Sequence, residues 1–435
     1  MLNAVKCLKR NRKDSDKMAE IRPFSALRYT KKAGDVKTCV CPPYDIISPK
    51  QKEEYLKTNP HNIIKLELPG TDYADYERAA TTLDSWKEDG ILKQDECDSI
   101  YAYEEEFTAL GKKYSFRGIV CRVKLYEFSE NVVLPHEETL SKAKEDRFCL
   151  MNATGCNISQ IYSLYSDKEG VTAKTVMGAT NKAPENEFTD GDGVTHRMWR
   201  ITDKAVIDEI CDQFKERKLY IADGHHRYET ALRYKKSVYG RGDSGYVMMF
   251  LIDMENDGLV VFPTHRIIRG IENYSTEKLI AGAKENFAVE KLESRDEISA
   301  RLSAGYEKCE KVFGYYDGKE SYLFTLKNKA ACDKAMPNAS EALKGLDVSV
   351  LHTLLLEQVL KIDKENMAKQ INLTYTRDEA EAYAAADGEA NACFIINPTR
   401  IDEIAAVAAA GEKMPQKSTY FYPKLITGLV MNSIF

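Results

Sequence analysis

A strand–turn–helix junction constrains the fold of this chain more than any other feature of its sequence. Residues 219–222 form a short apolar run that is typical of a buried strand. Helix-like spacing of apolar residues begins at residue 228, and Asp223-Gly224 separates the two patterns. The sequence therefore predicts a buried strand that turns sharply into a helix.

Three side chains that can carry positive charge, those of His225, His226 and Arg227, fall in the first turn of this expected helix. The partial positive charge of a helix N-terminus disfavours cations there by a few tenths of a kcal/mol each. A bound anion would offset this cost, and phosphate is the usual ligand of a helix N-terminus. The alternative is a solvent-exposed helix start, but two of only seven histidines are adjacent here. We interpret the turn as an anion site.

The composition is that of a globular protein of several domains. The chain has 435 residues, of which 43% are hydrophobic and 30% charged. A net charge of −6 gives no overall attraction to nucleic acid or to an anionic membrane. The eleven cysteines have no spacing typical of a zinc site, which favours reduced thiols in a cytoplasmic protein.

The chain divides into three expected parts. Residues 1–17 are basic, lack the apolar core of a signal peptide, and are interpreted as a disordered extension. No apolar run approaches the roughly 18 residues of a transmembrane helix. We expect a catalytic, nucleotide-binding core over residues 18–270 and a C-terminal α/β domain over residues 271–435. The loop 411–424 of the second domain is expected to reach the site of the first.

Strand and helix patterns alternate along the chain. Gly111 separates two runs that read as an antiparallel hairpin. Strands are expected at residues 37–41, 62–68, 101–107, 114–124 and 246–253, and helices at 50–57, 73–89, 275–286 and 348–360. Hairpins mixed with helices favour a mixed α/β or α+β fold, with mixed sheets and flanking helices, over a doubly wound sheet.

A charged segment precedes the junction, at residues 134–147. It is either a mixed carboxylate and cation site for phosphate, metal or proton transfer, or a solvated run of charges. The sequence His136-Glu137-Glu138 lacks the second histidine of a zinc-protease motif.

The loop from Gly411 to Lys424 places Lys417 and Ser418 at the positions of a phosphate-binding P-loop. Gln416 replaces the required second glycine, and the following residues do not open a helix, so the sequence excludes a P-loop. Lys417, Ser418 and Thr419 remain candidate phosphate ligands.

Two shorter segments supply further candidates. Pro42-Pro43 forms a rigid turn before Tyr44-Asp45. His265-Arg266 follows an apolar strand and can bind an anion, although a histidine at a strand end is more often structural.

With these segments the chain resembles, nearly end to end, the bacterial and archaeal family called domain of unknown function 1015. The matching segments, in order, are 21–24, 41–48, 134–139, 144–147, 222–229, 263–266, 346–352 and 414–419. Asp223-Gly-His-His-Arg227 also resembles the signature of the ParB and sulfiredoxin superfamily, in which it binds nucleotide phosphates, and it is similar to a motif of archaeal free-serine kinases. This second resemblance implies a ParB/sulfiredoxin-like nucleotide-binding core.

The motifs and these resemblances together lead us to expect a nucleotide-dependent phosphotransferase that uses ATP or ADP with Mg²⁺. Its acceptor is expected to be a small hydroxylated metabolite, with free L-serine the best single choice. Our candidate residues are: catalytic, Asp223, His225, His226, Glu137 and Glu138; phosphate- or nucleotide-binding, Gly224, Arg227, Arg147, Lys142, Lys417, Ser418 and Thr419; substrate-binding, Tyr44, Asp45, His136, His265 and Arg266; metal-binding, Asp223.

Two alternatives stay open at this stage. A phosphoserine phosphatase would use His225 or His226 as phospho-acceptor or acid. A non-catalytic, nucleotide-gated regulator that binds DNA is disfavoured by the net acidity and by the lack of a helix-turn-helix pattern. The expected partner is serine or phosphoserine, with no nucleic acid and no membrane, and a homodimer is allowed. We expect His136, Arg147, His225, His226 and Lys417 to line one cleft.

Overall fold

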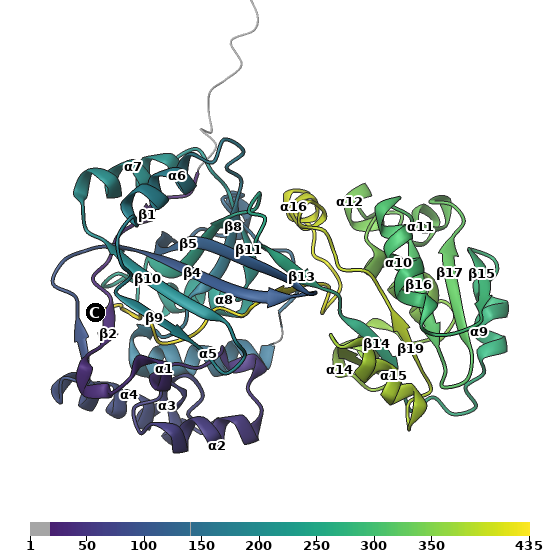
Figure 1. Cartoon of the computed structure of the whole chain (residues 1–435), viewed down its shortest axis with the longest axis horizontal. Coiled ribbons are helices and arrows are strands. Elements are labelled where there is room, and N and C mark those ends of the chain that lie inside the picture. The colour runs from purple at the N-terminus through teal and green to yellow at the C-terminus, as the bar shows by residue number, and fades with distance from the viewer. Residues whose placement is uncertain (1–17, 140) are drawn as a thin grey trace, which may run out of the picture.

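Two lobes lie side by side in the protein (Figure 1). The structure, a computed structural model, describes residues 18–139 and 141–435, so the extension expected over residues 1–17 lies outside the described residues. Within the described part, the larger lobe holds a nine-stranded sheet and the smaller lobe a six-stranded sheet. The mixed α/β fold with mixed sheets and flanking helices is thus confirmed. Among the described helices, none has the length and apolar character needed to cross a bilayer.

The larger sheet mixes parallel and antiparallel pairs. Its spatial order is β6 (Val133–Leu134), β11 (Leu219–Asp223), β8 (Ile161–Tyr165), β12 (Tyr246–Asp253), β5 (Lys112–Lys124), β4 (Ile100–Ala109), β10 (Thr195–Ile201) and β9 (Asn186–Thr189), with β1 (Ile21–Arg22) also paired to β5. β11 is parallel to β6 and β12 is parallel to β8, while the other pairs are antiparallel. The antiparallel pairing of β4 with β5 confirms the predicted hairpin. Its two turn residues, Leu110 and Gly111, both adopt the positive φ that a two-residue turn requires.

The two faces of this sheet are covered differently. Alternate residues of β12 point to opposite faces: Val247 packs with Met249 in one core, and Met248 packs with Phe250 in the other. Helices α7 (Lys204–Phe214) and α8 (His225–Ser237) cover the first face. The second face is covered by the C-terminal part of the chain, including α16 (Ile401–Ala409) and β20 (Tyr420–Tyr422).

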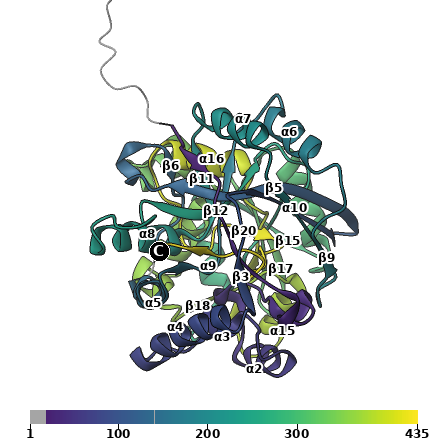
Figure 2. The same cartoon turned by 90° about the vertical axis from the view of Figure 1, so that its left-hand side faces the viewer.

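Other helices surround the larger sheet, and Figure 2 shows them above and below the strands. Helix α8 packs against α5 (Ser141–Thr154), which in turn packs against α4 (Tyr73–Glu88). The remaining helices and small strands of this lobe are α1 (Val36–Cys39), α2 (Pro49–Thr58), α3 (Ile64–Glu67), α6 (Val171–Ala179), β2 (Leu27–Tyr29), β3 (Leu92–Gln94), β7 (Cys156–Asn157) and β21 (Asn432–Ser433), with 3-10 turns at Lys31–Ala33, Tyr44–Ile46 and Phe128–Glu130.

The smaller lobe is an antiparallel sheet between two layers of helices. The sheet order is β15 (Phe287–Leu292), β17 (Ser321–Leu326), β16 (Val312–Tyr316), β19 (Ala392–Ile395), β14 (His265–Ile268) and β18 (Leu373–Thr376). One face packs on α9 (Thr276–Ala283), η4 (Leu351–Glu357) and α14 (Lys364–Lys369), and the other on α10 (Glu297–Glu307) and α15 (Glu379–Asp387). The lobe also contains α11 (Ala330–Ala335), α12 (Glu341–Lys344) and α13 (Asp347–Val350).

The chain crosses between the lobes twice near the same place. β13 (Val260–Phe262) pairs with β20, and β14 then enters the smaller sheet. After β19 the chain returns, and its last segment runs through the larger lobe to the C-terminus at the left of Figure 1. We expected the domain boundary after residue 270. In the structure the smaller sheet already includes β14, so the boundary lies before this strand. Residues 401–435, which we had assigned to the C-terminal domain, contribute to the core of the larger lobe through Ile404, Val407 and Phe421. They also contact the smaller lobe, where Glu403 pairs with Lys311.

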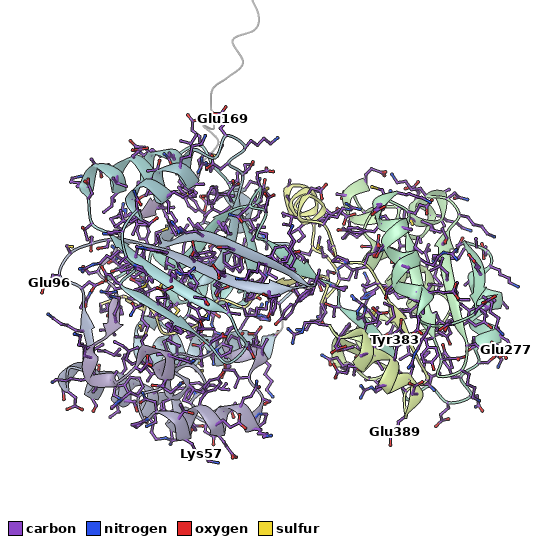
Figure 3. The ribbon with its side chains drawn as sticks, in the orientation of Figure 1. Lys57, Glu96, Glu169, Glu277, Tyr383 and Glu389 are labelled. Carbon is purple, nitrogen blue, oxygen red and sulfur yellow. The ribbon has the colours of Figure 1, made fainter. Side chains whose placement is uncertain are left out.

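Charged side chains cover the outer surface of both lobes. In Figure 3 the labelled Lys57, Glu96 and Glu169 project from the larger lobe, and Glu277 and Glu389 from the smaller one.

Two predicted strands are wrong. Residues 37–41 include helix α1, and residues 62–68 include helix α3. The side chain of Asn62 explains the second error, because its carbonyl accepts from the Ile64 N–H while its amide donates to the Thr38 and Val40 carbonyls. These local hydrogen bonds replace a strand ladder. The helix predicted over residues 348–360 is confirmed as α13 followed by a π-helical segment, η4.

Candidate anion-binding cleft

A cleft of about 970 Å³ lies between the lobes. The larger lobe contributes the β11–α8 junction and the segment around Lys417, and the smaller lobe contributes residues 375–381 and 395–398. This volume is at the upper end of the range for small-molecule sites. The predicted anion site therefore faces this cleft.

The junction has the geometry that the sequence predicts. Strand β11 ends at Asp223, Gly224 follows with φ +94°, and α8 begins at His225. A Cβ atom at position 224 would lie 2.9 Å from Nε of Arg227, so glycine is required both for the turn and for this arginine. No side chain caps the N-terminus of α8, which leaves its first-turn N–H groups available to a ligand.

Asp223 holds two cationic side chains beside this helix end. Its Oδ2 accepts from Nη2 of Arg227 at 2.7 Å and its Oδ1 accepts from Nζ of Lys424 at 2.6 Å. Burial alone would raise the pKa of Asp223, but Lys424 and Arg227 outweigh it and hold this pKa well below its usual range. One carboxylate between two cations leaves a net positive charge at the base of the cleft.

Arg227 is fixed by further contacts. Its Nη1 donates to the carbonyl of Gln160. Its buried Nε has no hydrogen-bond partner among the described residues. One donor of the guanidinium, the Nε–H, is therefore unused by the described residues.

His225 is buried and its ring is held in one tautomer. The backbone N–H of His136 donates to Nε2 of His225 at 3.2 Å, so the neutral ring carries its proton on Nδ1. The two imidazole rings meet edge to face with centroids 4.6 Å apart. Burial lowers the pKa of His225 well below its usual value, and nearby His136 adds to this. His225 is therefore neutral at pH 7 and its Nε2 lone pair is already used.

His226 is half-buried and faces the cleft. Its pKa is lowered by burial, while Asp45 and Glu229 act in the opposite direction. Glu229 is itself engaged by Thr139 and Lys144. Of the two adjacent histidines, His226 is the more accessible to a ligand.

Two segments far apart in sequence form one wall of the cleft. The N–H of Met414 donates to the carbonyl of His136 at 2.7 Å, and Glu137 forms a parallel bridge with Met414. Oε1 of Glu137 accepts from the Lys417 N–H at 3.4 Å. Burial raises the pKa of Glu137, although Lys417 opposes this. A carboxyl group with a raised pKa thus lines the cleft.

Thr419, Tyr44, Asp45 and His265 also line the cleft, as the sequence suggested. Oγ1 of Thr419 lies 3.1 Å from Nε2 of His136, which sits behind it. His265 is buried, which lowers its pKa to about 4, and its Nδ1 accepts from the Ile396 N–H. This contact gives His265 a structural role at the strand end.

Besides His136, five candidates do not line the cleft. Lys142 is exposed on α5, and Glu138 points toward a different cavity. Ser418 is buried, with its hydroxyl donating to the Pro415 carbonyl. Arg266 is fully buried. Arg147 lies in a small pocket behind the junction.

Arg147 illustrates why charge alone is a weak signal. Its Nη1 donates to the carbonyl of Glu67 at 2.8 Å, its Nη2 lies 2.6 Å from Asp146, and its guanidinium stacks on the ring of Tyr44 at 4.1 Å. Of the five residues expected to share a cleft, His225, His226 and Lys417 line it, His136 supports it from behind, and Arg147 lies in the small pocket.

The sequence did not identify several residues that line the cleft. Lys424 belongs to the loop 411–424 but was not among our candidate site residues. Its position after an aromatic run was its only sequence signal. Tyr420 lies under Lys424, with Nζ 4.6 Å from the ring centroid. The residues Arg377, Asp378 and Glu379 of the smaller lobe belong to no motif that we recognised.

The metal site expected at Asp223 has a different arrangement in the structure. Both oxygens of Asp223 are occupied by cationic side chains. Across the described residues, no cluster of three or more His, Cys, Asp or Glu side chains is arranged to hold a metal ion.

The fold is that of a mixed α/β protein with a cleft at the N-terminus of α8. The chain belongs to the family described as protein of unknown function (DUF1015), whose model matches residues 21–349. The resemblance drawn from the sequence motifs is thus confirmed. No curated protein is significantly similar in sequence.

Some solved structures are distantly similar in fold. A conserved hypothetical protein from Pyrococcus furiosus is 16% identical with a TM-score of 0.34, over 70% of this chain and 90% of that chain. A free serine kinase in complex with AMP is 14% identical with a TM-score of 0.38, over 73% and 91%. SbnI with C-terminal truncation from Staphylococcus aureus is 12% identical with a TM-score of 0.35, over 71% and 87%. These scores are too low to assign a function.

Proposed function

We propose that this protein is a nucleotide-dependent phosphotransferase that acts on a small hydroxylated metabolite, with free L-serine as the best candidate. The observation that carries the proposal is the uncapped N-terminus of α8, which faces a cleft of about 970 Å³ beside Arg227 and Lys424. A ParB/sulfiredoxin-like nucleotide-binding core remains part of this proposal.

The nucleotide phosphates bind at the start of α8. Gly224 lets the backbone approach them, and the N–H groups of the first turn donate to their oxygens. Arg227 and Lys424 neutralise part of the phosphate charge. Asp223 orients these two cations, because both of its oxygens are engaged by them. We therefore assign Asp223 a positioning role and not that of a metal ligand.

The metal enters this scheme with the nucleotide. Mg²⁺ commonly takes substrate phosphates and water as most of its ligands, together with one or two carboxylates. Asp378, which lines the cleft from the smaller lobe, is suited to this contact. Bound Mg²⁺ would supply further neutralisation of the phosphate charge.

Glu137 is the proposed base for the acceptor hydroxyl. Its pKa is raised by burial, and a base works best when its pKa lies near the working pH. The hydroxyl oxygen forms a bond to the terminal phosphorus, the bond from phosphorus to the bridging oxygen breaks, and the hydroxyl proton passes to Glu137. His226 and Lys417 stabilise the transferred group from the open side of the cleft.

L-Serine fits the charges of the cleft. Asp45 is exposed and lines the cleft, so its carboxylate is available to the ammonium group of an amino acid. His225 supports the site without reacting, because its Nε2 accepts from His136. This contact also disfavours His225 as the phospho-acceptor of a phosphatase.

The decisive assay incubates the full-length protein with Mg²⁺, L-serine and either ATP or ADP, and separately with phosphoserine. The proposal expects phosphoserine and the shortened nucleotide in equal amounts. Release of inorganic phosphate from phosphoserine without any nucleotide would support the phosphatase instead and overturn the kinase.

Two lysine variants tie this activity to the cleft. Lys417→Ala should lower turnover roughly tenfold, because it removes a charged contact to the transferred group. Lys142→Ala removes an exposed lysine of α5 outside the cleft and should leave turnover unchanged. Equal turnover in both variants would remove Lys417 from the site.

A further inference from the structure

A second cavity of about 400 Å³ lies on the other side of the wall formed by residues 136–139 and 413–419. Neighbouring residues of this wall face different cavities: Glu137 faces the cleft, whereas Glu138 faces the second cavity. Much of the lining is apolar, with Met336, Leu343, Met367 and Met414 among its residues. The cavity is large enough for a small organic molecule.

Two buried hydroxyl groups of this cavity are unsatisfied. Ser349 is 2% exposed and its Oγ has no hydrogen-bond partner among the described residues. The same holds for the hydroxyl oxygen of Tyr375, which lines the cavity from β18. An unpaired buried hydroxyl typically costs about 1–3 kcal/mol, so such groups are usually satisfied by a ligand or an ordered water.

His352 adds a third polar group on the same face of the helical segment, three residues after Ser349. Its Nε2 accepts from Nε of Arg266 at 3.2 Å, so the neutral ring carries its proton on Nδ1. His352 lines the cavity and lies in the π-helical segment η4. Such segments often occur at functional sites.

The charge of Arg266 lies directly behind these groups. Arg266 is fully buried, and its other nitrogens donate to the carbonyls of Thr264 and Lys417. Its guanidinium carbon lies 5.4 Å from the ring centroid of Tyr375. Within the described residues, no carboxylate forms an ion pair with Arg266. A buried cation without a counterion favours an anion nearby.

We propose that this cavity is a second binding site, which takes a small organic carboxylate with an apolar body. The carboxylate accepts from the hydroxyls of Ser349 and Tyr375 in the field of Arg266, and the apolar part packs on the methionine-rich lining. The rim is electrically balanced, with Lys364 and Lys413 opposite Glu138 and Glu357. Selection therefore takes place inside the cavity and not at its mouth.

The test uses hexanoate as the probe and hexan-1-ol as its neutral match, titrated into the full-length protein by calorimetry. Hexanoate should bind with one site per chain and hexan-1-ol at least roughly tenfold more weakly, because hydrogen bonds to a charged acceptor are the stronger ones. Equal affinity for both, or no hexanoate binding, would overturn the proposal.

Two serine variants locate the site. Ser349→Ala should weaken hexanoate binding roughly tenfold, while Ser303→Ala, a serine that lines the main cleft, should leave it unchanged. Thermal unfolding of both variants checks that they are folded. As a second approach, Met367→Trp fills the cavity and should abolish hexanoate binding in a protein that still melts cooperatively. Unchanged binding in Ser349→Ala or in folded Met367→Trp would place the ligand elsewhere.

Discussion

The cleft and the second cavity each have an arginine beside them, but the two arginines differ in their partners. Arg227 pairs with Asp223, which also holds Lys424. Arg266 is bound by His352 and by two backbone carbonyls. A carboxylate partner fixes a cation in position and lowers its net charge. Where only neutral acceptors are present, the full charge remains to attract a ligand.

The difference also suggests two kinds of ligand. The cleft combines a helix N-terminus with cations that are already oriented, which suits a multiply charged phosphate chain. The second cavity combines one unneutralised cation with hydroxyl donors and an apolar lining, which suits a smaller, singly charged molecule.

The largest effect is expected for the carboxyl group on the cleft side of the shared wall. Glu137→Gln should lower kcat by about 10² to 10⁴, because it removes the proposed general base. Glu138→Gln changes the neighbouring residue, which faces the second cavity, and should leave kcat within twofold. Steady-state kinetics with L-serine and nucleotide measure both. Comparable losses in the two variants would contradict the assignment of Glu137 as the base.

Removing the charge of Asp223 should make the two arginines alike, because Arg227 would then lack a carboxylate partner as Arg266 does. Asp223→Asn leaves Arg227 and Lys424 buried without a carboxylate, which should lower the free energy of unfolding by about 3–5 kcal/mol. Asp45→Asn removes an exposed carboxylate and should change it by less than about 0.5 kcal/mol. Urea unfolding at pH 7 provides the measurement. A loss below about 1 kcal/mol for Asp223→Asn would show that the cations need no counterion.

Two buried histidines near the cleft, His136 and His265, should make the free energy of unfolding depend on pH. Burial lowers the pKa values of His136 and His265 to about 4, below the value of about 6.5 expected for the unfolded chain. Their contribution is fully present above pH 6.5 and is lost as the pH falls from there toward 4. At pH 5 the loss should be roughly 2 kcal/mol for each histidine.

Unfolding free energies at pH 7 and pH 5 test this dependence. His265→Gln should show a smaller loss between the two pH values than the wild type. His61→Gln, which changes a half-buried histidine near α3, is the control and should retain the wild-type dependence. A wild-type protein that is equally stable at both pH values would contradict the burial of neutral histidines.

A smaller effect is expected on nucleotide affinity. Arg227→Ala should weaken ADP binding roughly 10- to 100-fold, because a charge-assisted contact to phosphate is lost. Arg233→Ala, on the same helix, removes an exposed arginine that pairs with Glu145, and should leave the affinity unchanged. Calorimetry with ADP and Mg²⁺ separates the two. Equal affinity in both variants would mean that phosphate does not bind at the start of α8.

The junction at Asp223-Gly224 was predictable because its signals are local: an apolar run, a glycine that must adopt positive φ, and a helix that follows at once. The error at residues 62–68 arose because Asn62 makes hydrogen bonds to a segment more than twenty residues away. The periodicity of the sequence contains no information about such bonds. Local patterns therefore gave the fold class and most elements, but not every turn.

The membership of the site was less predictable than its centre. Lys424 reaches Asp223 across 201 positions of the chain, and Arg147 is drawn away from the cleft by Glu67 and Asp146. Both outcomes depend on tertiary contacts. Segments 346–352 and 414–419, which contribute to the second cavity, were recognised only as matches to the family. The cavity itself could not be predicted, because its unpaired hydroxyls can be recognised only when the surrounding side chains are in place.

The central claim is that phosphate binds at the N-terminus of α8, and the backbone amides of that turn test it most directly. The chain has only seven histidines, so protein labelled with ¹⁵N-histidine gives few amide signals, which His225→Gln and His226→Gln variants assign. On addition of ADP and Mg²⁺, the amide signals of His225 and His226 should shift strongly, while that of His196, in the strand β10, stays in place. Saturating ADP that leaves the His225 and His226 signals unchanged would contradict the account.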